Sequence, residues 1–198
     1  MSFATTLVPR TVRVETANYL IRSLEVADAN ESFGAWLLDP NAQRLLNAKP
    51  RRLTLPQVRA HIASFDRVNA HLLGIFEKRT GRLVGMRAVM INHQLKEYLV
   101  NVLIGEADAR GKGARHETRF AMHNFMFEEL GMEAAVCSVL DENVEMIRTI
   151  EKNGWVLQRM SRKAKASGAG QVALRDYRLT RETWRASQAG IAFRDMTG

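Results

Sequence analysis

The amino-acid sequence predicts a mixed α/β fold, in which helices pack on a sheet. Segments whose apolar and polar residues alternate, as in half-buried strands, are interspersed with segments whose apolar residues recur at helical spacing. Turn-forming Gly, Asn and Pro residues separate these segments. Of the 198 residues, 46% are hydrophobic and 25% are charged, which is usual for a globular protein. We expect a single domain over residues 1–198, with its core at about 10–185 and a tail at 186–198.

The first half of the chain is expected to form three strands and two helices. Their approximate bounds are 18–25, 70–77 and 82–92 for the strands, and 30–38 and 54–68 for the helices. Asp28 or Asn30 can cap the first helix, and Pro40 stops it. Thr54 fits the cap of the second helix, and a short glycine-containing loop joins the last two strands.

The next strand is expected at about residues 97–104, and it carries many of the candidate site residues. Because side chains alternate across a strand, its residues divide between two faces. One face holds Glu97, Leu99, Asn101 and Leu103, and the other holds Tyr98, Val100, Val102 and Ile104.

The second half of the chain is expected to alternate helices and strands. The helices lie at about 113–131 and 141–153, and the strands at 134–140, 155–162 and 171–179. Gly131 fits a helix C-cap, and Asp141 can cap the following helix. The short apolar segment before Asp141 is typical of a buried strand.

The net charge of +8 favours anionic partners without identifying one. A positive field attracts nucleic acids and phosphate-bearing small molecules alike. The basic residues between Arg159 and Arg185 are not interleaved with the aromatic residues that single-strand binders use for stacking. No helix-turn-helix, zinc-finger or RNA-recognition signature accompanies them. Nucleic acid is therefore not expected to be the main ligand.

The cysteine content and the apolar runs exclude further classes of protein. Cys137 is the sole cysteine, and His116 and His123 do not make a zinc site without a third ligand. The longest apolar runs are far shorter than the roughly 20 residues that cross a bilayer. The first ten residues lack a basic start followed by an apolar core, so no secretory signal is expected. These observations favour a cytoplasmic protein without a membrane partner and without a metal.

The turn between the 97–104 strand and the following helix gives the clearest chemical signal. Arg110-Gly111-Lys112-Gly113 stands where that helix begins. The first N–H groups of a helix have no partner inside it, and the helix dipole places positive charge there. Glycines let phosphate groups approach the backbone, and Arg110 and Lys112 add charge. Taken alone, the turn fits a phosphate site and a purely structural helix cap equally well. Its spacing is neither that of a P-loop nor that of a dinucleotide fingerprint.

Together with later motifs, this turn resembles the GNAT superfamily of acetyl-CoA-dependent N-acetyltransferases. Ile104-Gly105, Arg110-Gly111-Lys112-Gly113 and Glu117 are followed by Asn143 and by Glu151-Lys152-Asn153-Gly154-Trp155 at the distances found in this family. More narrowly, the motifs resemble its ribosomal-protein N-terminal acetyltransferase branch. The resemblance covers roughly residues 10–185 and implies the GNAT fold, with a central, mostly antiparallel sheet flanked by helices.

The resemblance also implies a binding site for acetyl-CoA, which serves as co-substrate. The backbone of Val102, Leu103 and Ile104 would pair with the pantetheine arm. Asn143 would hydrogen-bond the same arm. The backbone N–H groups around the diphosphate would belong to the turn that comprises Arg110, Gly111, Lys112, Gly113, Ala114 and Arg115.

Three residues depart from the family pattern. Arg115 stands where the family has a small residue. Its side chain would either crowd the diphosphate or turn outward and pair with the 3′-phosphate of the cofactor. Met146 stands in place of a serine, and Ile150 in place of the tyrosine with which other branches protonate the leaving thiolate. The helix that follows Asn143 therefore supplies neither hydroxyl.

Amine acetylation needs a base for the amine and a donor for the carbonyl oxygen. Glu97 is our candidate for the base, because several family members carry a glutamate at the start of this strand, although the branch itself more often has it at the position of Leu99. The alternative for Glu97 is a solvated hairpin end beside Lys96. Asn101 shares its face and is a candidate substrate contact. Trp36, on the helix that covers the acceptor site in this family, is either a core residue or a wall of the substrate pocket.

The sequence thus predicts an N-acetyltransferase that transfers acetyl to a primary amine by direct attack in a ternary complex, because no activated Ser or Cys nucleophile is evident. The acceptor is left open between a small amine, such as an amino sugar, and a protein N-terminus. The positive charge favours an anionic small molecule. Two alternatives are a GNAT-like module that binds CoA without catalysis, and a ribosome- or RNA-associated binding protein. A homodimer is also left open.

Overall fold

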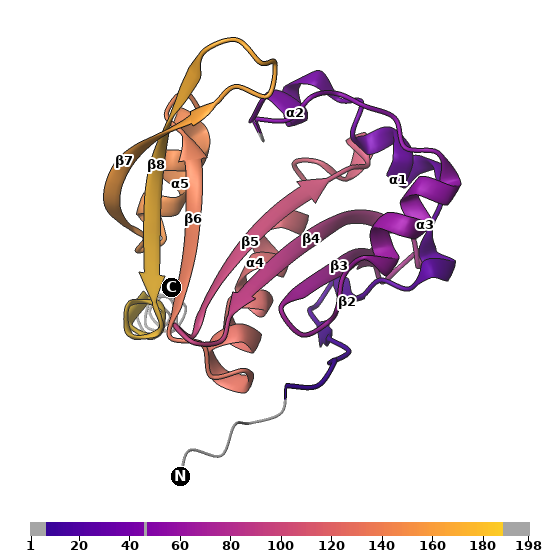
Figure 1. Ribbon diagram of the computed structural model, residues 1–198. Helices are drawn as coiled ribbons and strands as arrows, with labels where there is room; N and C mark the ends of the chain where they lie inside the picture. Colours follow the sequence, from indigo (N-terminus) through magenta and orange to yellow (C-terminus); the bar gives the residue numbers. More distant parts are fainter. Residues whose placement is uncertain (1–6, 46, 188–198) are drawn as a thin grey trace.

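The computed structural model describes residues 7–45 and 47–187, within which the strands form one eight-stranded sheet (Figure 1). In chain order the strands are β1 (Arg13–Glu15), β2 (Tyr19–Ser23), β3 (Ala70–Glu77), β4 (Leu83–Asn92), β5 (Glu97–Ile104), β6 (Ala134–Leu140), β7 (Val156–Ala164) and β8 (Gln171–Thr180). Their order across the sheet is β1-β2-β3-β4-β5-β6-β8-β7. All neighbours are antiparallel except β5 and β6, which are parallel. The mixed, mostly antiparallel sheet that the sequence predicts is confirmed.

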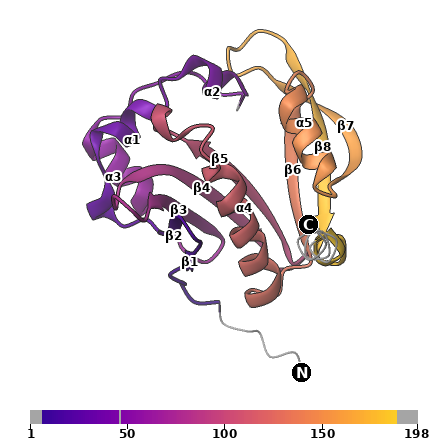
Figure 2. The same cartoon turned by 180° about the vertical axis from the view of Figure 1, so that it is seen from behind.

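Helices cover both faces of this sheet. The labelled helices are α1 (Glu31–Trp36), α2 (Pro40–Leu45), α3 (Leu55–Ala63), α4 (Ala114–Asn124) and α5 (Val144–Lys152). Helices α4 and α5 lie on one face (Figure 2), where Tyr98 and Phe127 belong to the largest buried cluster. Helices α1 and α3 pack against the other face, where Phe33 and Leu103 share a second cluster. Tyr98 and Leu103 therefore lie on opposite faces of β5, as its alternation predicts.

The parallel strands β5 and β6 stay together over a short distance only. Glu97, Tyr98 and Leu99 pair with residues 134–136, and beyond them the two strands diverge. Both views show the sheet opening into a V between β5 and β6 (Figures 1 and 2). From Val100 onward, the edge of β5 that faces β6 has no strand partner among the described residues. This open edge positions the candidate site.

Several helix boundaries differ from the prediction. The helix expected at 54–68 ends at Ala63, because the Asp66 carboxylate then accepts hydrogen bonds from three consecutive backbone N–H groups and folds the chain into a turn. Pro40 begins α2 instead of only ending α1, since proline is well suited to the first position of a helix. The strand β1 was not predicted, because three residues are too few to establish an alternating pattern.

The ends of the later helices also need correction. The helix expected at 113–131 is an α-helix to Asn124 and then a π-helical segment, Phe125–Glu129. Helix α5 is capped by Asn143 rather than by Asp141, which instead pairs with Arg175. The tail expected at 186–198 lies almost entirely outside the described residues. Within the described part, no helix is long and apolar enough to span a membrane.

Candidate active site

A glycine turn at the start of α4 leaves its backbone open. Gly111 and Gly113 have φ angles of 75° and 82°, in the left-handed region that favours glycine. A Cβ atom at either position would meet no heavy atom within 4 Å. Gly113 is the N-cap of α4, and no side chain caps the helix there. The first N–H groups of α4 are therefore available to an anion such as a diphosphate.

Arg110 fastens this turn to the end of β5. Its Nε donates to the carbonyl oxygen of Ile104 at 3.0 Å, and Nη2 donates to that of Gly105 at 3.1 Å. Nη1 pairs with the Asp39 carboxylate at 2.5 Å. The guanidinium thus binds protein groups at the strand end, and any direct contact of Arg110 with a diphosphate stays a prediction.

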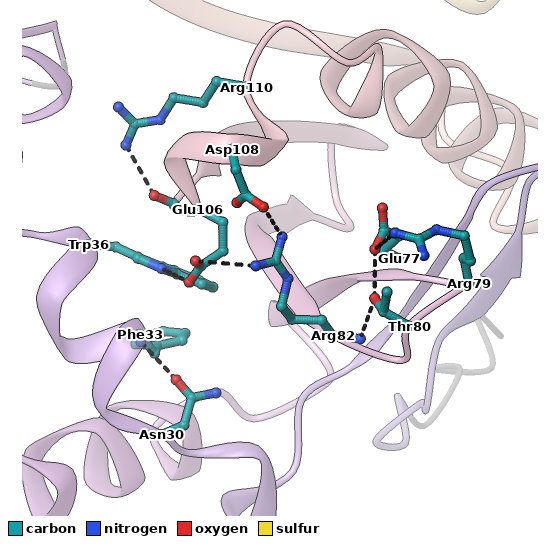
Figure 3. A network of polar contacts seen from close by, with 11 residues as sticks. Asn30, Phe33, Trp36, Glu77, Arg79, Thr80, Arg82, Glu106, Asp108 and Arg110 are labelled. Atoms are coloured by element: carbon teal, nitrogen blue, oxygen red, sulfur yellow. Dashed lines mark hydrogen bonds and ion pairs between the residues drawn. The ribbon is translucent and has the colours of Figure 1, made fainter.

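A polar network holds the same turn from the side of α1 (Figure 3). The Trp36 Nε1 donates to the Glu106 carboxylate at 2.9 Å, and Arg82 pairs with Asp108 at 2.6 Å. The Trp36 ring lies so close to Gly105 that a Cβ there would come within 1.9 Å of it. Trp36 is only 5% exposed and belongs to the core. Of the two alternatives for Trp36, the structure favours the core residue, and its part in an acceptor pocket stays a prediction.

The other turn residues differ in exposure. Ala114 is buried, whereas the side chains of Lys112 and Arg115 are exposed. The carbonyl oxygen of Lys112 accepts a hydrogen bond from the Tyr19 hydroxyl at 3.3 Å. For Arg115, the exposed side chain fits the alternative in which it turns outward, and its pairing with the 3′-phosphate stays a prediction.

The two arms of the V carry the remaining predicted cofactor residues. Val102, Leu103 and Ile104 lie in the diverging part of β5, with β4 on one side and the opening on the other. Asn143 stands at the start of α5, where its Oδ1 accepts from the backbone N–H of Met146 at 3.2 Å. The sole hydroxyl of α5, on Thr149, donates to a carbonyl oxygen within the helix. Helix α5 therefore offers no hydroxyl to the opening.

Glu97 lies at the closed end of the V, and its carboxylate forms an ion pair with Arg178 of β8. Lys96 pairs with Glu133 instead, at 3.0 Å. The Glu97 side chain is 20% exposed. Glu97 is thus held in place by a cation from another strand, and its role as a base stays a prediction.

A cavity of about 290 Å³ opens on the same face of the sheet as Glu97. Leu99, Ser138, Asp176 and Arg178 are among its lining residues. Asn101, further along β5 on this face, is exposed. Residues of four strands, β5, β6, β7 and β8, line the cavity, and its place beside Glu97 makes it the candidate for the acceptor side of the site.

Ser138 and Asp176 were not predicted from the sequence. The Ser138 hydroxyl donates to the Asp176 carboxylate at 2.6 Å, and the Arg159 Nε donates to it at 2.9 Å. Burial alone raises the pKa of Asp176, but these hydrogen bonds outweigh it and hold the pKa below its ordinary value. The one available signal is a serine within the otherwise apolar segment 134–140.

Neither Cys137 nor the histidines form a reactive or metal-binding cluster. Burial raises the pKa of Cys137 to about 12, so its thiol stays protonated at neutral pH. Burial lowers the pKa of His123 to about 3, and its ring is hydrogen-bonded to Tyr98, whereas His116 is exposed. Within the described residues, no group of three or more His, Cys, Asp or Glu side chains could hold a metal ion.

A splayed pair of parallel strands beside an uncapped, glycine-led helix defines a class of acyltransferases that bind a phosphate-bearing acyl carrier. Residues 18–156 match the acetyltransferase (GNAT) domain family. The chain belongs to this family of N-acetyltransferases, whose members use acetyl-CoA. Comparison with curated protein sequences gives no match.

Solved structures support the same fold. A GNAT-family acetyltransferase from Bacillus anthracis is 17% identical, with a TM-score of 0.73 and coverage of 86% of this chain and 99% of that one. The ribosomal-protein-S5-alanine acetyltransferase from Vibrio fischeri is 12% identical, with a TM-score of 0.71 and coverage of 87% and 98%. The spermidine N-acetyltransferase from Vibrio cholerae, in complex with CoA and spermine, is 14% identical, with a TM-score of 0.73 and coverage of 85% and 98%. At these identities the likeness establishes the fold and leaves the acceptor open.

Proposed function

We propose that this acetyltransferase binds acetyl-CoA along the open edge of β5 and transfers the acetyl group to the primary amine of a small, negatively charged acceptor. The observation that carries the proposal is the V between β5 and β6, which meets the uncapped N-terminus of α4. The open glycine backbone at Gly111 and Gly113 fits the diphosphate. The unpaired edge at Val102, Leu103 and Ile104 fits the amide groups of the pantetheine arm.

The charge around the opening supports an anionic acceptor. The hairpin of β7 and β8 carries Arg162, Lys163 and Lys165 on exposed positions near its end. Both amide atoms of Asn47, just after α2, bond to this hairpin: Nδ2 donates to the carbonyl oxygen of Ala164, and Oδ1 accepts from the backbone N–H of Ala166. These contacts place the basic hairpin end beside α2, at the wide end of the V (Figure 1), where its positive field would attract an anionic molecule as it enters the opening.

The chemistry requires one proton to leave the amine as it attacks the thioester carbonyl. Glu97 is the proposed base, directly or through a water molecule, and Arg178 orients its carboxylate. Since Met146 and Ile150 bring no hydroxyl, the thiolate would take its proton from solvent. Asn101 and the Ser138 hydroxyl are the polar groups proposed to face the acceptor.

The direct test is to incubate the purified protein with acetyl-CoA and separate amines, and to follow free thiol. The panel contains an amino-sugar phosphate, spermine and a peptide with a free N-terminus. We expect amine-dependent thiol release, fastest with the amino-sugar phosphate. A preference for the peptide or for spermine would overturn the proposed acceptor class but would still show that the protein is an acetyltransferase.

A non-catalytic CoA-binding module is the second candidate, because the Glu97 carboxylate is engaged by Arg178 and α5 supplies no acid. Binding of CoA, measured by calorimetry, without thiol release for any amine would establish it. Absence of CoA binding would overturn the proposed site itself.

A further inference from the structure

Arg87 of β4 is a buried cation beneath the first two turns of α4. Arg87 is 2% exposed, and its side chain ranks among the most completely buried large side chains of the protein. Nη2 donates to the Thr118 hydroxyl at 2.8 Å and to the carbonyl oxygen of Arg115 at 3.0 Å. Thr118 in turn donates to the carbonyl oxygen of Ala114 at 2.6 Å. The guanidinium is thereby fixed against the turn of α4 that follows Gly113.

No carboxylate among the described residues pairs with Arg87. Its charged neighbours are Arg119 and Arg115, and burial together with these two cations lowers the pKa of Arg87 to about 9. Arg119 donates from Nη2 to Asn153 at 2.8 Å, while its Nη1 is buried without a hydrogen-bond partner in the described structure. Arg87 and Arg119 thus place two positive charges along the N-terminal half of α4, and the exposed Arg115 adds a third at its first turn.

Such a cluster is costly in the absence of an anion. A buried charge without an opposite charge destabilises a folded protein, and two nearby like charges add to that cost. A methionine or leucine at position 87 would fill this interior position of β4 without the cost of a buried charge. The uncapped N–H groups that begin α4 are one turn away, and the positive charges of these arginines would attract an anion bound there.

We infer that Arg87 is a positioning residue for the cofactor diphosphate, and that its buried charge, fixed to the first turn of α4, strengthens that turn as an anion site at the expense of the stability of the free protein. Arg119 adds to the same field. The inference rests on the proposed cofactor site and goes beyond it, because it assigns part of the affinity to charges that do not line the open turn.

The test compares R87M with the unchanged protein and with R87K, which keeps the charge. Calorimetry measures the dissociation constant of CoA, and thermal unfolding measures Tm without ligand. We expect R87M to bind CoA about tenfold or more weakly, to unfold at a higher temperature than the unchanged protein when free, and to gain less Tm from CoA. R87K should lie between the two in affinity.

A second readout separates the charge from the packing. Acetyl-pantetheine lacks the diphosphate, so R87M should leave its KM unchanged while raising the KM of acetyl-CoA, with kcat little altered. A purely structural arginine would give the opposite: a lower Tm in R87M, with the preference for acetyl-CoA over acetyl-pantetheine retained. That result would overturn the inference.

Two outcomes keep this test separate from that of the proposed function. If the unchanged protein does not bind CoA, the proposed site fails. If it binds CoA and the R87M preference is retained, only the role of Arg87 fails. Should R87M not fold, R119L takes its place: it removes the neighbouring charge with its unpartnered Nη1 and should weaken CoA binding with no loss of Tm, and an unchanged CoA affinity would count against the inference.

Discussion

The proposed site has two sides, a cofactor side at the turn before α4 and an acceptor side around Glu97, and they are stabilised in different ways. On the cofactor side, hydrogen bonds from Arg110, and from Trp36 to Glu106, hold the turn at 105–113 in place. The groups that this turn presents to a ligand are backbone N–H groups. On the acceptor side, the groups on offer are side chains that pair with one another across strands, such as Glu97 with Arg178. The comparison teaches that the glycine turn is encoded within a single short segment, whereas the acceptor side exists only once distant strands have paired.

The largest effect is expected on the cofactor side, from Gly113→Asp. A side chain at φ 82° costs about 1–2 kcal/mol, and a carboxylate about 4 Å from a diphosphate adds repulsion of several kcal/mol at an effective dielectric constant of about 20. We therefore expect the dissociation constant of CoA, measured by calorimetry, to rise on the order of ten-thousandfold. Gly113→Ala is the matched control, because it carries the backbone strain alone and should cost roughly tenfold. An unchanged affinity in the Asp variant would contradict the assignment of the turn.

The acceptor side is tested by Glu97→Gln. If Glu97 is the base, kcat should fall about a hundredfold, while CoA binds as before because the carboxamide keeps the shape of the side chain. The measurement is a pH–rate profile with the best amine of the panel. The exposed Lys96→Gln exchange at the neighbouring position is the control and should leave kcat intact. A normal rate across the pH range would remove Glu97 from the mechanism.

A smaller effect concerns His123, which is buried near the C-terminal end of α4. The pKa of His123 is lowered from 6.5 to about 3 by burial, so the folded protein keeps this ring neutral while the unfolded chain takes up a proton below pH 6.5. The stability contribution of His123 is therefore complete above pH 6.5 and is lost as the pH falls towards 3, at about 1.4 kcal/mol per pH unit.

Urea unfolding between pH 4 and pH 7 measures this dependence. His123→Phe should lower stability at pH 7, because the hydroxyl of Tyr98 loses its partner, and should unfold with a shallower dependence on pH. To isolate the ring, both proteins carry Tyr98→Phe in a parallel series. Identical slopes in the two proteins would show that His123 does not titrate in this way.

The fold and the glycine turn that we propose for the cofactor follow from local patterns. The strands expected at 70–77, 82–92 and 97–104 lie close to their observed bounds, because their apolar residues and the turn residues that flank them are local to each segment. The glycine turn is equally local, since a positive φ and a missing cap are properties of consecutive residues. The family match over residues 18–156 agrees with the motifs on which the resemblance rests.

The acceptor side could not be predicted in the same way. Ser138 contacts Asp176 only because β6 and β8 pair in a particular register. No pattern within either strand predicts that register. Arg178 reaches Glu97 across β6 for the same reason. Arg87 did leave a trace, as a charged residue at an inward position of an alternating strand. Its surroundings, with arginines and no carboxylate, required the structure.

The bonds between Asn47 and the β7–β8 hairpin have a consequence for access. Together with the pair of Arg44 and Glu142, they join the two arms again at the wide end of the gap. The two arms are therefore in contact at both ends of the gap. A small molecule or an extended peptide could enter without breaking these contacts, whereas a folded partner that entered from the wide end would first have to break them.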